Sequence, residues 1–358
     1  MSYFHLNLIL KGKLTVCCLL MLPAIPLNAQ REAKQIGDFK ESISLNEHLR
    51  GTKRTLQYRP DGDEFVCVNG KNRYTRALYG SHSPFRVETS DRPVFAFYNN
   101  GRGGNISFKV ILRDGTELAL DCTGHCESRY SAGKRTYYLT DPSWGKGELR
   151  ISVLALADMD GAIWRFSPSN MPKGAILRWQ HGGATGKRLS RNGDMGVDPA
   201  DCFELPVEAT DLVTGELPLQ KEVYLVRGEV PEDYNVRKLY QQAEAASLAL
   251  ASHLKIETPD PYLNTLGGAL VAAADGIWDG QVWLHGAIGW RMPLSGWRAG
   301  YTGDALGWHD RARTHFDAYA ASQVTDVPNT IPHPVQDSTM NLARSEKRWG
   351  TPQYSNGY

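Results

Sequence analysis

The chain has 358 residues, of which 41% are hydrophobic and 22% charged, and its 40 basic residues nearly balance its 39 acidic ones. This composition is that of a soluble globular protein with room for two domains. The balanced charge argues against a nucleic-acid-binding protein, which needs a basic surface, and favours a neutral ligand.

The first 29 residues have the pattern of a secretory signal peptide. Lys11 and Lys13 precede an apolar run over residues 14–22, and prolines then lead to Ala29. We expect cleavage after Ala29 and an exported protein, periplasmic or extracellular. The apolar run is too short to span a membrane, so no membrane span is expected.

Four cysteines follow the signal peptide: Cys67, Cys122, Cys126 and Cys202. Four in so long a chain do not make a disulfide framework. The spacing of Cys122, His125 and Cys126 fits no common zinc pattern, and no partner pair follows. The sequence therefore predicts no metal and no other cofactor.

Residues 30–235 are predicted to form an antiparallel β-sandwich. Short apolar runs alternate with turn signals such as Asn69-Gly70 and Asp114-Gly115, which is typical of hairpins. The runs are 65–68, 94–98, 106–112, 149–154, 163–166, 175–180 and 222–227. The glycine-rich stretch 181–186 lacks the Gly-Lys-Ser/Thr of a phosphate loop, and we expect an ordinary loop there.

Near Pro231 the hydrophobic period changes from two to about 3.6 residues. A linker helix is expected within residues 236–257, and a second helix from Tyr262 to about Ile277 after the breakers at 258–261. A third helix is expected from about Asp304 to Ser322. Residues 258–358 are therefore predicted to be a separate helical region.

The stretch from Trp278 to Arg313 has an unusual composition. Five tryptophans lie in it beside arginine, aspartate and histidine: Trp278, Trp283, Trp290, Trp297 and Trp308. Indole rings stack on the C–H faces of sugars, and the charged side chains supply the directional hydrogen bonds that a polyol needs. The stretch thus predicts a glycan-binding cleft, and the alternative is a Trp-rich core with a long buried loop.

The order of sandwich, linker helix and Trp-rich helical region resembles the secreted six-hairpin glycosidases of glycan-degrading Bacteroidetes. Within that superfamily, Arg298-Ala-Gly-Tyr-Thr-Gly-Asp-Ala305 is similar to the Asp-Glu-Arg-x-Gly-Trp-Thr-Gly-Asp-Ala motif of the α-L-rhamnosidase branch. The similarity covers eight residues, and Tyr301 stands where that branch has tryptophan. It implies an (α/α)6 toroid after the sandwich and hydrolysis of a glycosidic bond.

The resemblance implies sugar-binding residues in this chain more clearly than it implies catalytic ones. Asp304 matches the sugar-binding aspartate of the branch, but its general-acid glutamate would fall on Trp297. A glycosidase needs two carboxyl groups about 5 to 10 Å apart. Asp279, Asp304 and Asp310 are the candidate catalytic residues. For Asp279, near Trp278 and Trp283, loss of water would favour the protonated form. A helix cap or an ion pair with Arg311 or Arg313 is the alternative role.

The predicted glycan-binding residues are Trp283, His285, Trp290, Trp297, Arg298, Tyr301, Trp308 and His309. A complete toroid needs roughly 350 residues, so we expect an incomplete toroid in residues 258–358 and a longer full enzyme. A non-catalytic or degenerate glycan-binding protein and a toroid polysaccharide lyase are the alternatives. The oligomeric state is not indicated.

Overall fold

The computed structural model describes residues 57–71, 76–83, 85–99, 102–183, 212–231, 233–284 and 293–321. The first strands are β1 (Arg59–Asp61), β2 (Glu64–Val68), β3 (Arg76–Leu78), β4 (Arg86–Thr89), β5 (Phe95–Asn99), β6 (Arg102–Ile111) and β7 (Glu117–Ala119). They are followed by β8 (His125–Ser131), β9 (Lys134–Thr140), β10 (Glu148–Ala155), β11 (Gly161–Ser169), β12 (Ile176–Gly183), β13 (Val213–Pro218) and β14 (Val223–Gly228). Short 3-10 turns occupy Leu120–Cys122 and Pro142–Trp144.

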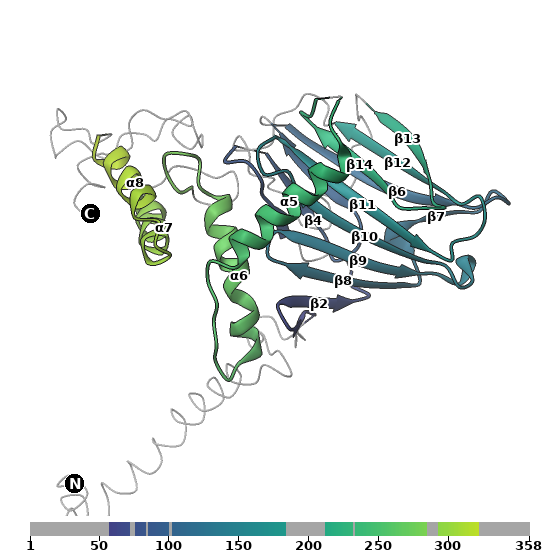
Figure 1. Ribbon diagram of the computed structural model, residues 1–358, viewed down its shortest axis with the longest axis horizontal. Coiled ribbons are helices and arrows are strands. Elements are labelled where there is room, and N and C mark those ends of the chain that lie inside the picture. The colour runs from purple at the N-terminus through teal and green to yellow at the C-terminus, as the bar shows by residue number, and fades with distance from the viewer. Residues whose placement is uncertain are drawn as a thin grey trace, which may run out of the picture. The chain divides into compact units, whose positions relative to one another are not determined.

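The strands form two antiparallel sheets (Figure 1). The first sheet has the order β1-β2-β8-β9-β10-β11-β14, and the second has the order β13-β12-β6-β5-β4-β3, with β7 beside β6. This confirms the predicted antiparallel sandwich and most of its strand positions. The loop expected at 181–186 is wrong at its start, because His181 to Gly183 continue β12 and pair with β6.

The main core contains the inward-facing residues of both sheets. On β10, Leu149, Ile151 and Val153 alternate with residues of the opposite face, as the period of two requires. Trp164 of β11 lies at the centre, with ring centroids 5.5 Å from Phe95 and 6.2 Å from Phe108. The contact with Phe95 is edge-on, a geometry that adds to the stability gained from burying the two rings.

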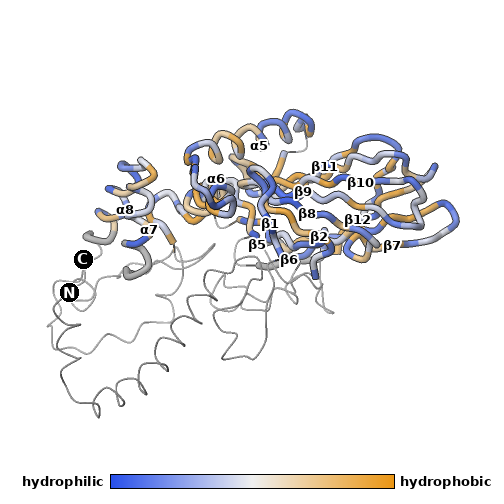
Figure 2. Tube along the Cα trace, turned by 90° about the horizontal axis from the view of Figure 1, so that it is seen from below, coloured by the Kyte–Doolittle hydropathy of each residue, from blue (hydrophilic) through white to orange (hydrophobic). Residues whose placement is uncertain are grey.

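Helix α5 (Val236–Ala251) begins at an N-cap, where the Asn235 side chain accepts a hydrogen bond from the Lys238 N–H. Its buried face, Leu239, Tyr240 and Ala243, packs on Leu154 and Ile163 of the first sheet. Figure 2 shows apolar and polar stretches alternating along α5, as expected for an amphipathic helix. A helix therefore begins at Val236, where the linker helix was predicted to begin, and ends at Ala251.

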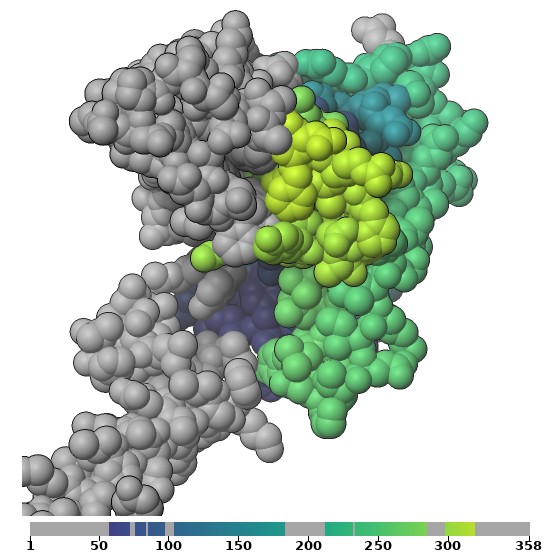
Figure 3. All heavy atoms as spheres, turned by 90° about the vertical axis from the view of Figure 1, so that its left-hand side faces the viewer, coloured from purple at the N-terminus to yellow at the C-terminus, as the bar shows by residue number. Residues whose placement is uncertain are grey.

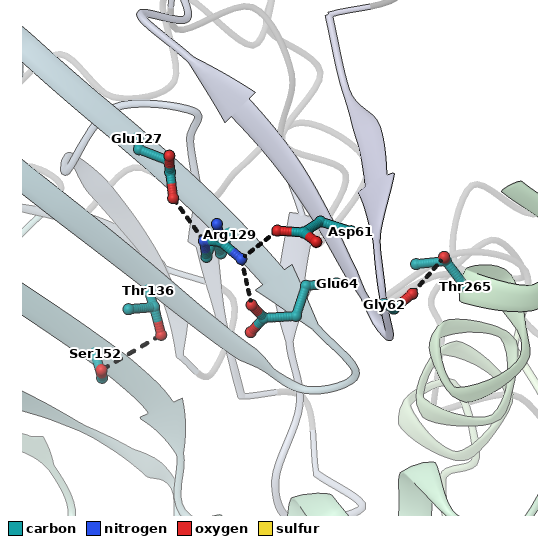
Figure 4. A network of polar contacts seen from close by, with 8 residues as sticks. All are labelled: Asp61, Gly62, Glu64, Glu127, Arg129, Thr136, Ser152 and Thr265. Carbon is teal, nitrogen blue, oxygen red and sulfur yellow. Dashed lines mark hydrogen bonds and ion pairs between the residues drawn. The ribbon is translucent and has the colours of Figure 1, made fainter. Parts of the chain in front are cut away.

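Helix α6 (Pro261–Gly276) is capped by Asp260, whose side chain accepts a hydrogen bond from the Tyr262 N–H. The Thr265 hydroxyl donates to Gly62 O at 2.9 Å and so joins α6 to the β1–β2 turn (Figure 4). Two helices follow, α7 (Pro293–Ala305) and α8 (His309–Ala321).

The expected single helix from Asp304 to Ser322 is therefore wrong in its first residues. Asp304 lies in the last turn of α7, which ends at Ala305, and a short turn with Gly307 at φ 83° separates α7 from α8. Helices α5 to α8 of the described residues do not show a toroid. None of the described helices is both long and apolar enough to cross a membrane.

Candidate functional site

The Trp-rich segment begins at the end of α6 and continues through α7 into α8. His285 and Trp290 lie outside the described residues, and Trp297 lies in α7 with its side chain outside them. The other predicted site residues are described. They divide into a buried group, a group that supports turns, and an exposed group.

Trp283 belongs to the buried group, with 0% of its surface exposed. Its backbone N–H donates to Nδ1 of His315 at 3.0 Å, and its indole N–H donates to Ala274 O at 2.9 Å. Trp278 pairs with it across an antiparallel bridge, with ring centroids 4.6 Å apart. Trp283 therefore packs a small core and presents no face for stacking on a sugar, which corrects the expectation for this residue.

Trp308 is half-buried and already stacks on other rings. Its ring centroid lies 6.5 Å from that of Trp283 and 5.3 Å from that of His253, nearly parallel to both. The Arg311 guanidinium lies 4.7 Å from the Trp308 centroid. Trp308 thus connects the end of α5 with α8, and much of its ring area is used within the protein.

The two glycines of the motif at 298–305 have a packing explanation. A Cβ atom at Gly303 would lie 2.1 Å from Cη2 of Trp283, and one at Gly300 would lie 2.9 Å from Cζ of Phe316. Both distances are shorter than real Cβ contacts allow. The glycines therefore let α7 approach the buried indole and α8, a requirement that exists whether or not a ligand binds.

Asp279 supports a tight turn. Its Oδ1 accepts hydrogen bonds from the backbone N–H groups of Gln281, at 2.9 Å, and Val282, at 2.7 Å. Asp310 lies exposed in the first turn of α8, where a carboxylate is stabilised by the helix dipole. Asp279 therefore stabilises a turn between helices, and Asp310 is the second residue of α8; the helix cap that the sequence left open is shown for neither.

Arg298, Tyr301, Asp304 and His309 make up the exposed group. The side chains of Asp304 and His309 are 57% and 72% exposed, and Tyr301 is 59% exposed. Nδ1 of His309 donates a hydrogen bond to Oδ1 of Asp304 at 2.6 Å. Residues 298, 301 and 304 lie three apart and so share one side of α7. Figure 3 shows α7 and α8, in yellow, at the surface turned to the viewer.

Sequence reasoning missed Asp275 of α6, which contacts a residue of the sandwich and a residue of α8. Nε2 of His82, in the loop after β3, lies 3.2 Å from both Asp275 oxygens, and Arg311 of α8 donates to Oδ1 at 2.7 Å. Burial raises the pKa of Asp275, but the hydrogen bonds of His82 and Arg311 outweigh it and keep the pKa below its ordinary value. His82 is 193 residues away in sequence, so no local pattern could reveal the pair.

A cavity of about 220 Å³ lies beside His82 and Asp275, between the sandwich and helices α5 and α6. Alanines form much of its wall, with Tyr79, Tyr130 and Ser247 as further polar residues. Burial, and after it the Glu88 carboxylate, raises the pKa of Tyr79. Ligand pockets usually enclose about 300 Å³ or more, and none of the predicted site residues lines this cavity.

No cluster of three or more His, Cys, Asp or Glu side chains that could hold a metal ion occurs among the described residues. Cys67 and Cys126 are free and buried in the sandwich, and Cys122 is free and exposed. Burial raises the pKa of Cys67 to about 11 and that of Cys126 to about 12. Both thiols therefore stay protonated and unreactive near neutral pH.

Residues 100–229 match DUF4450, a family described as a domain of unknown function. The match runs from β6 to β14 and so concerns the sandwich. No curated protein matches the chain. The similarity therefore brings no known activity to the Trp-rich segment, which lies outside the matched residues.

Proposed function

We propose that this protein is carbohydrate-active, that it contacts a glycan through the exposed side of α7 and α8, and that the full-length protein is a glycoside hydrolase. The observation that carries the proposal is the 59% exposed ring of Tyr301, on the same side of α7 as Asp304, whose carboxylate is hydrogen-bonded to His309. Exposed aromatic rings with adjacent directional polar groups are the means by which proteins bind sugars.

Each exposed residue has a chemical role in this proposal. The phenol ring of Tyr301 takes the place of the indole in the rhamnosidase motif and stacks on the C–H face of a sugar ring. Asp304 and His309 hydrogen-bond to hydroxyl groups, as the sugar-binding aspartate of that branch does. Arg298, one helical turn before Tyr301, adds donors that are always charged. The site binds a neutral glycan without a metal ion.

Hydrolysis requires an acid and a base or nucleophile. Of the three predicted carboxylates, Asp279 is already engaged by two backbone N–H groups. We therefore assign catalytic contact to Asp304, with Asp310, next to His309 at the start of α8, as the candidate second carboxylate. The resemblance to six-hairpin glycosidases adds the proposals that residues 258–358 belong to an α/α toroid and that residues 1–29 direct export.

The proposal is tested by affinity electrophoresis of the purified protein in gels containing plant and host polysaccharides, followed by product analysis. Tyr301→Ala should weaken retention by roughly five- to tenfold, the loss of one stacking contact. Asp304→Asn should lower any hydrolysis rate by roughly 10² or more. Asp279→Ala is the matched control, because it removes a carboxylate of the same segment without altering the exposed side of α7.

The products distinguish the three classes of protein. Release of reducing sugar without ultraviolet absorbance identifies a hydrolase, and unsaturated ends that absorb in the near ultraviolet identify a lyase. Retention without any product identifies a binding protein. Migration unaffected by every polysaccharide, or equal retention of Tyr301→Ala and the unsubstituted protein, would show that α7 and α8 are not a glycan site.

A further inference from the structure

The outer face of the first sheet is the face on which α5 packs. Beside the apolar contacts of α5, this face carries polar residues. On β10, Arg150 and Ser152 point away from the core residues Leu149 and Ile151. On β11, Arg165 does the same between the core residues Trp164 and Phe166. Two arginines therefore lie on adjacent strands, on the side of the sheet that α5 crosses (Figure 1).

The strand register brings these arginines together. Arg150 is opposite Ser167, and Ser152 is opposite Arg165, so the two arginines are diagonal neighbours. Diagonal neighbours across a strand pair lie roughly 7 to 8 Å apart. An extended arginine side chain spans a comparable distance, so both guanidinium groups can reach the same oxyanion. The Ser152 hydroxyl lies near them and is 3.3 Å from that of Thr136 (Figure 4).

Each arginine rests on an aromatic ring and not on a carboxylate. The Arg165 guanidinium lies 4.3 Å from the ring centroid of Tyr240 on α5, and that of Arg150 lies 5.3 Å from the ring of Tyr138. In both arginines the Nε atom is buried and makes no hydrogen bond, and among the described residues no carboxylate forms an ion pair with either. Buried charge without a counter-charge is costly unless something pairs with it.

Arg129 of β8, on the same face and three strands from Arg165 of β11, shows the contrast. It is bound by Glu127 at 2.6 Å, Asp61 at 2.9 Å and Glu64 at 3.1 Å (Figure 4). Arg129 is therefore neutralised by carboxylates of its own sheet, unlike Arg150 and Arg165. Two carboxylates whose charges act on the same tyrosines as Arg165 are already paired: Glu244 with Lys134 at 3.0 Å, and Glu222 with the Tyr224 hydroxyl at 2.6 Å.

Tyr240 adds a donor to the same place. Its hydroxyl is buried without a hydrogen bond of good geometry, and the Ser152 hydroxyl is the neighbouring polar group. Burial raises the pKa of Tyr240, although the charge of Arg165 opposes this shift. The hydroxyl therefore keeps its proton near neutral pH and can donate it in a hydrogen bond. Two guanidinium groups and a neutral phenol together match the acceptor oxygens of an oxyanion.

We infer that Arg150, Arg165 and Tyr240 bind the oxyanion of an acidic ligand, a carboxylate or a sulfate or phosphate ester, on the outer face of the first sheet beside α5. Paired arginines bind such groups through parallel N–H donors, which a lysine cannot reproduce. This oxyanion site lies on the sandwich and does not depend on α7 and α8, so it stands or falls separately from the proposed glycan function.

Isothermal titration calorimetry of the full chain tests the site with three anionic probes: galacturonate, glucose 6-phosphate and inorganic sulfate. Galactose, the neutral counterpart of galacturonate, is the control ligand and should not bind here. Binding of galacturonate alone would identify a carboxylate ligand. Binding of the phosphate ester or of sulfate would identify the tetrahedral oxyanion.

Arg150→Gln and Arg165→Gln should each weaken binding of the anion by roughly tenfold or more, because each removes charge-assisted hydrogen bonds. Arg150→Lys keeps the charge and serves if the glutamine variant does not fold; it should bind less tightly than the unsubstituted protein. Arg113→Gln removes one positive charge at an exposed turn and should have no effect. Tyr301→Ala should also leave anion binding unchanged.

Two results would overturn the inference. The first is the absence of saturable binding for all three anions in low salt. The second is an equal loss of binding in Arg113→Gln and Arg165→Gln, which would mean that only the overall charge matters.

Discussion

The sandwich and the α7–α8 region differ in what their side chains contact. In the sandwich, aromatic and aliphatic residues from both sheets fill one continuous core around Trp164. In the helical region the buried cluster consists of Trp278, Trp283 and Ala312, with partly buried residues around it. The sandwich therefore buries more apolar area than the helical region. The stability of the helical region depends on a few close contacts.

The polar residues differ in the same way. Arg129 in the sandwich is held by three carboxylates, whereas Tyr301, Asp304 and His309 on the helices are directed to solvent. The proposed glycan site thus lies on the region with the smaller core, whereas the proposed oxyanion site lies on the sandwich. The following predictions compare the stability of the two regions.

Trp164→Ala should have the largest effect. Removing this fully buried indole leaves a cavity between Phe95 and Phe108, and such substitutions cost about 3 to 5 kcal/mol. Urea unfolding followed by circular dichroism measures the loss. Val68→Ala, on a half-exposed side chain, is the control and should change stability by less than about 1 kcal/mol. A loss below 1 kcal/mol for Trp164→Ala would contradict the proposed core.

His181→Gln should alter the pH dependence of sandwich stability. Burial, followed by the charge of Arg227, lowers the pKa of His181 from 6.5 to about 4, and Nε of Arg227 donates to its Nδ1 at 3.1 Å. Between these pH values the unfolded chain takes up a proton that the folded chain does not. Stability is therefore fully present above pH 6.5 and falls as the pH is lowered toward 4.

The glutamine variant keeps an acceptor for Arg227 but cannot titrate. Its stability loss between pH 7 and pH 4 should be smaller than that of the unsubstituted protein by about 2 kcal/mol, after allowance for partial exposure. Denaturant titrations at a series of pH values give the difference. Parallel curves for the two proteins over this range would rule out a neutral, buried His181.

Gly303→Ala should have a smaller and local effect. Helix propensity alone favours alanine by about 1 kcal/mol. The added Cβ, however, would lie 2.1 Å from the Trp283 ring, and forcing extra volume into a packed site costs about 1 to 3 kcal/mol. Since Trp283 is completely buried and cannot move aside, we expect net destabilisation of about 1 kcal/mol.

Hydrogen exchange read by mass spectrometry locates this effect. Amides of α7, α8 and the turn at 277–284 should exchange faster in Gly303→Ala, while those of the sandwich strands stay unchanged. Ala305→Ser, an exposed substitution on the same helix, should alter neither region. Increased protection of α7 would mean that propensity outweighs the clash.

Much of the sandwich could be predicted from sequence, because the information is local. The alternation in 149–154 and 163–166 follows directly from the period of a strand, and Asp114-Gly115 marks the turn between the paired strands β6 and β7. Asn69-Gly70 ends β2 but forms no hairpin, because β2 and β3 lie in different sheets. Asn235 and Asp260 cap the first two helices where the change of period and the Thr258–Pro261 breakers indicated their starts. Helix α7 was not predicted before Asp304 because its three glycines are poor helix signals that tertiary contacts override.

The candidate site could be predicted only in part. The sequence by itself determined which residue types gather between 278 and 313, and hence the kinds of chemistry available there. Only the tertiary structure decided that Trp283 is core, that Asp279 supports a turn, and that Tyr301 and Asp304 face solvent. It also decided that Asp275 binds His82, and that Arg150 and Arg165 share one face. The physical reason is that burial and charge pairing depend on distances between segments far apart in the chain, whereas periodicity and capping depend on neighbours within one turn.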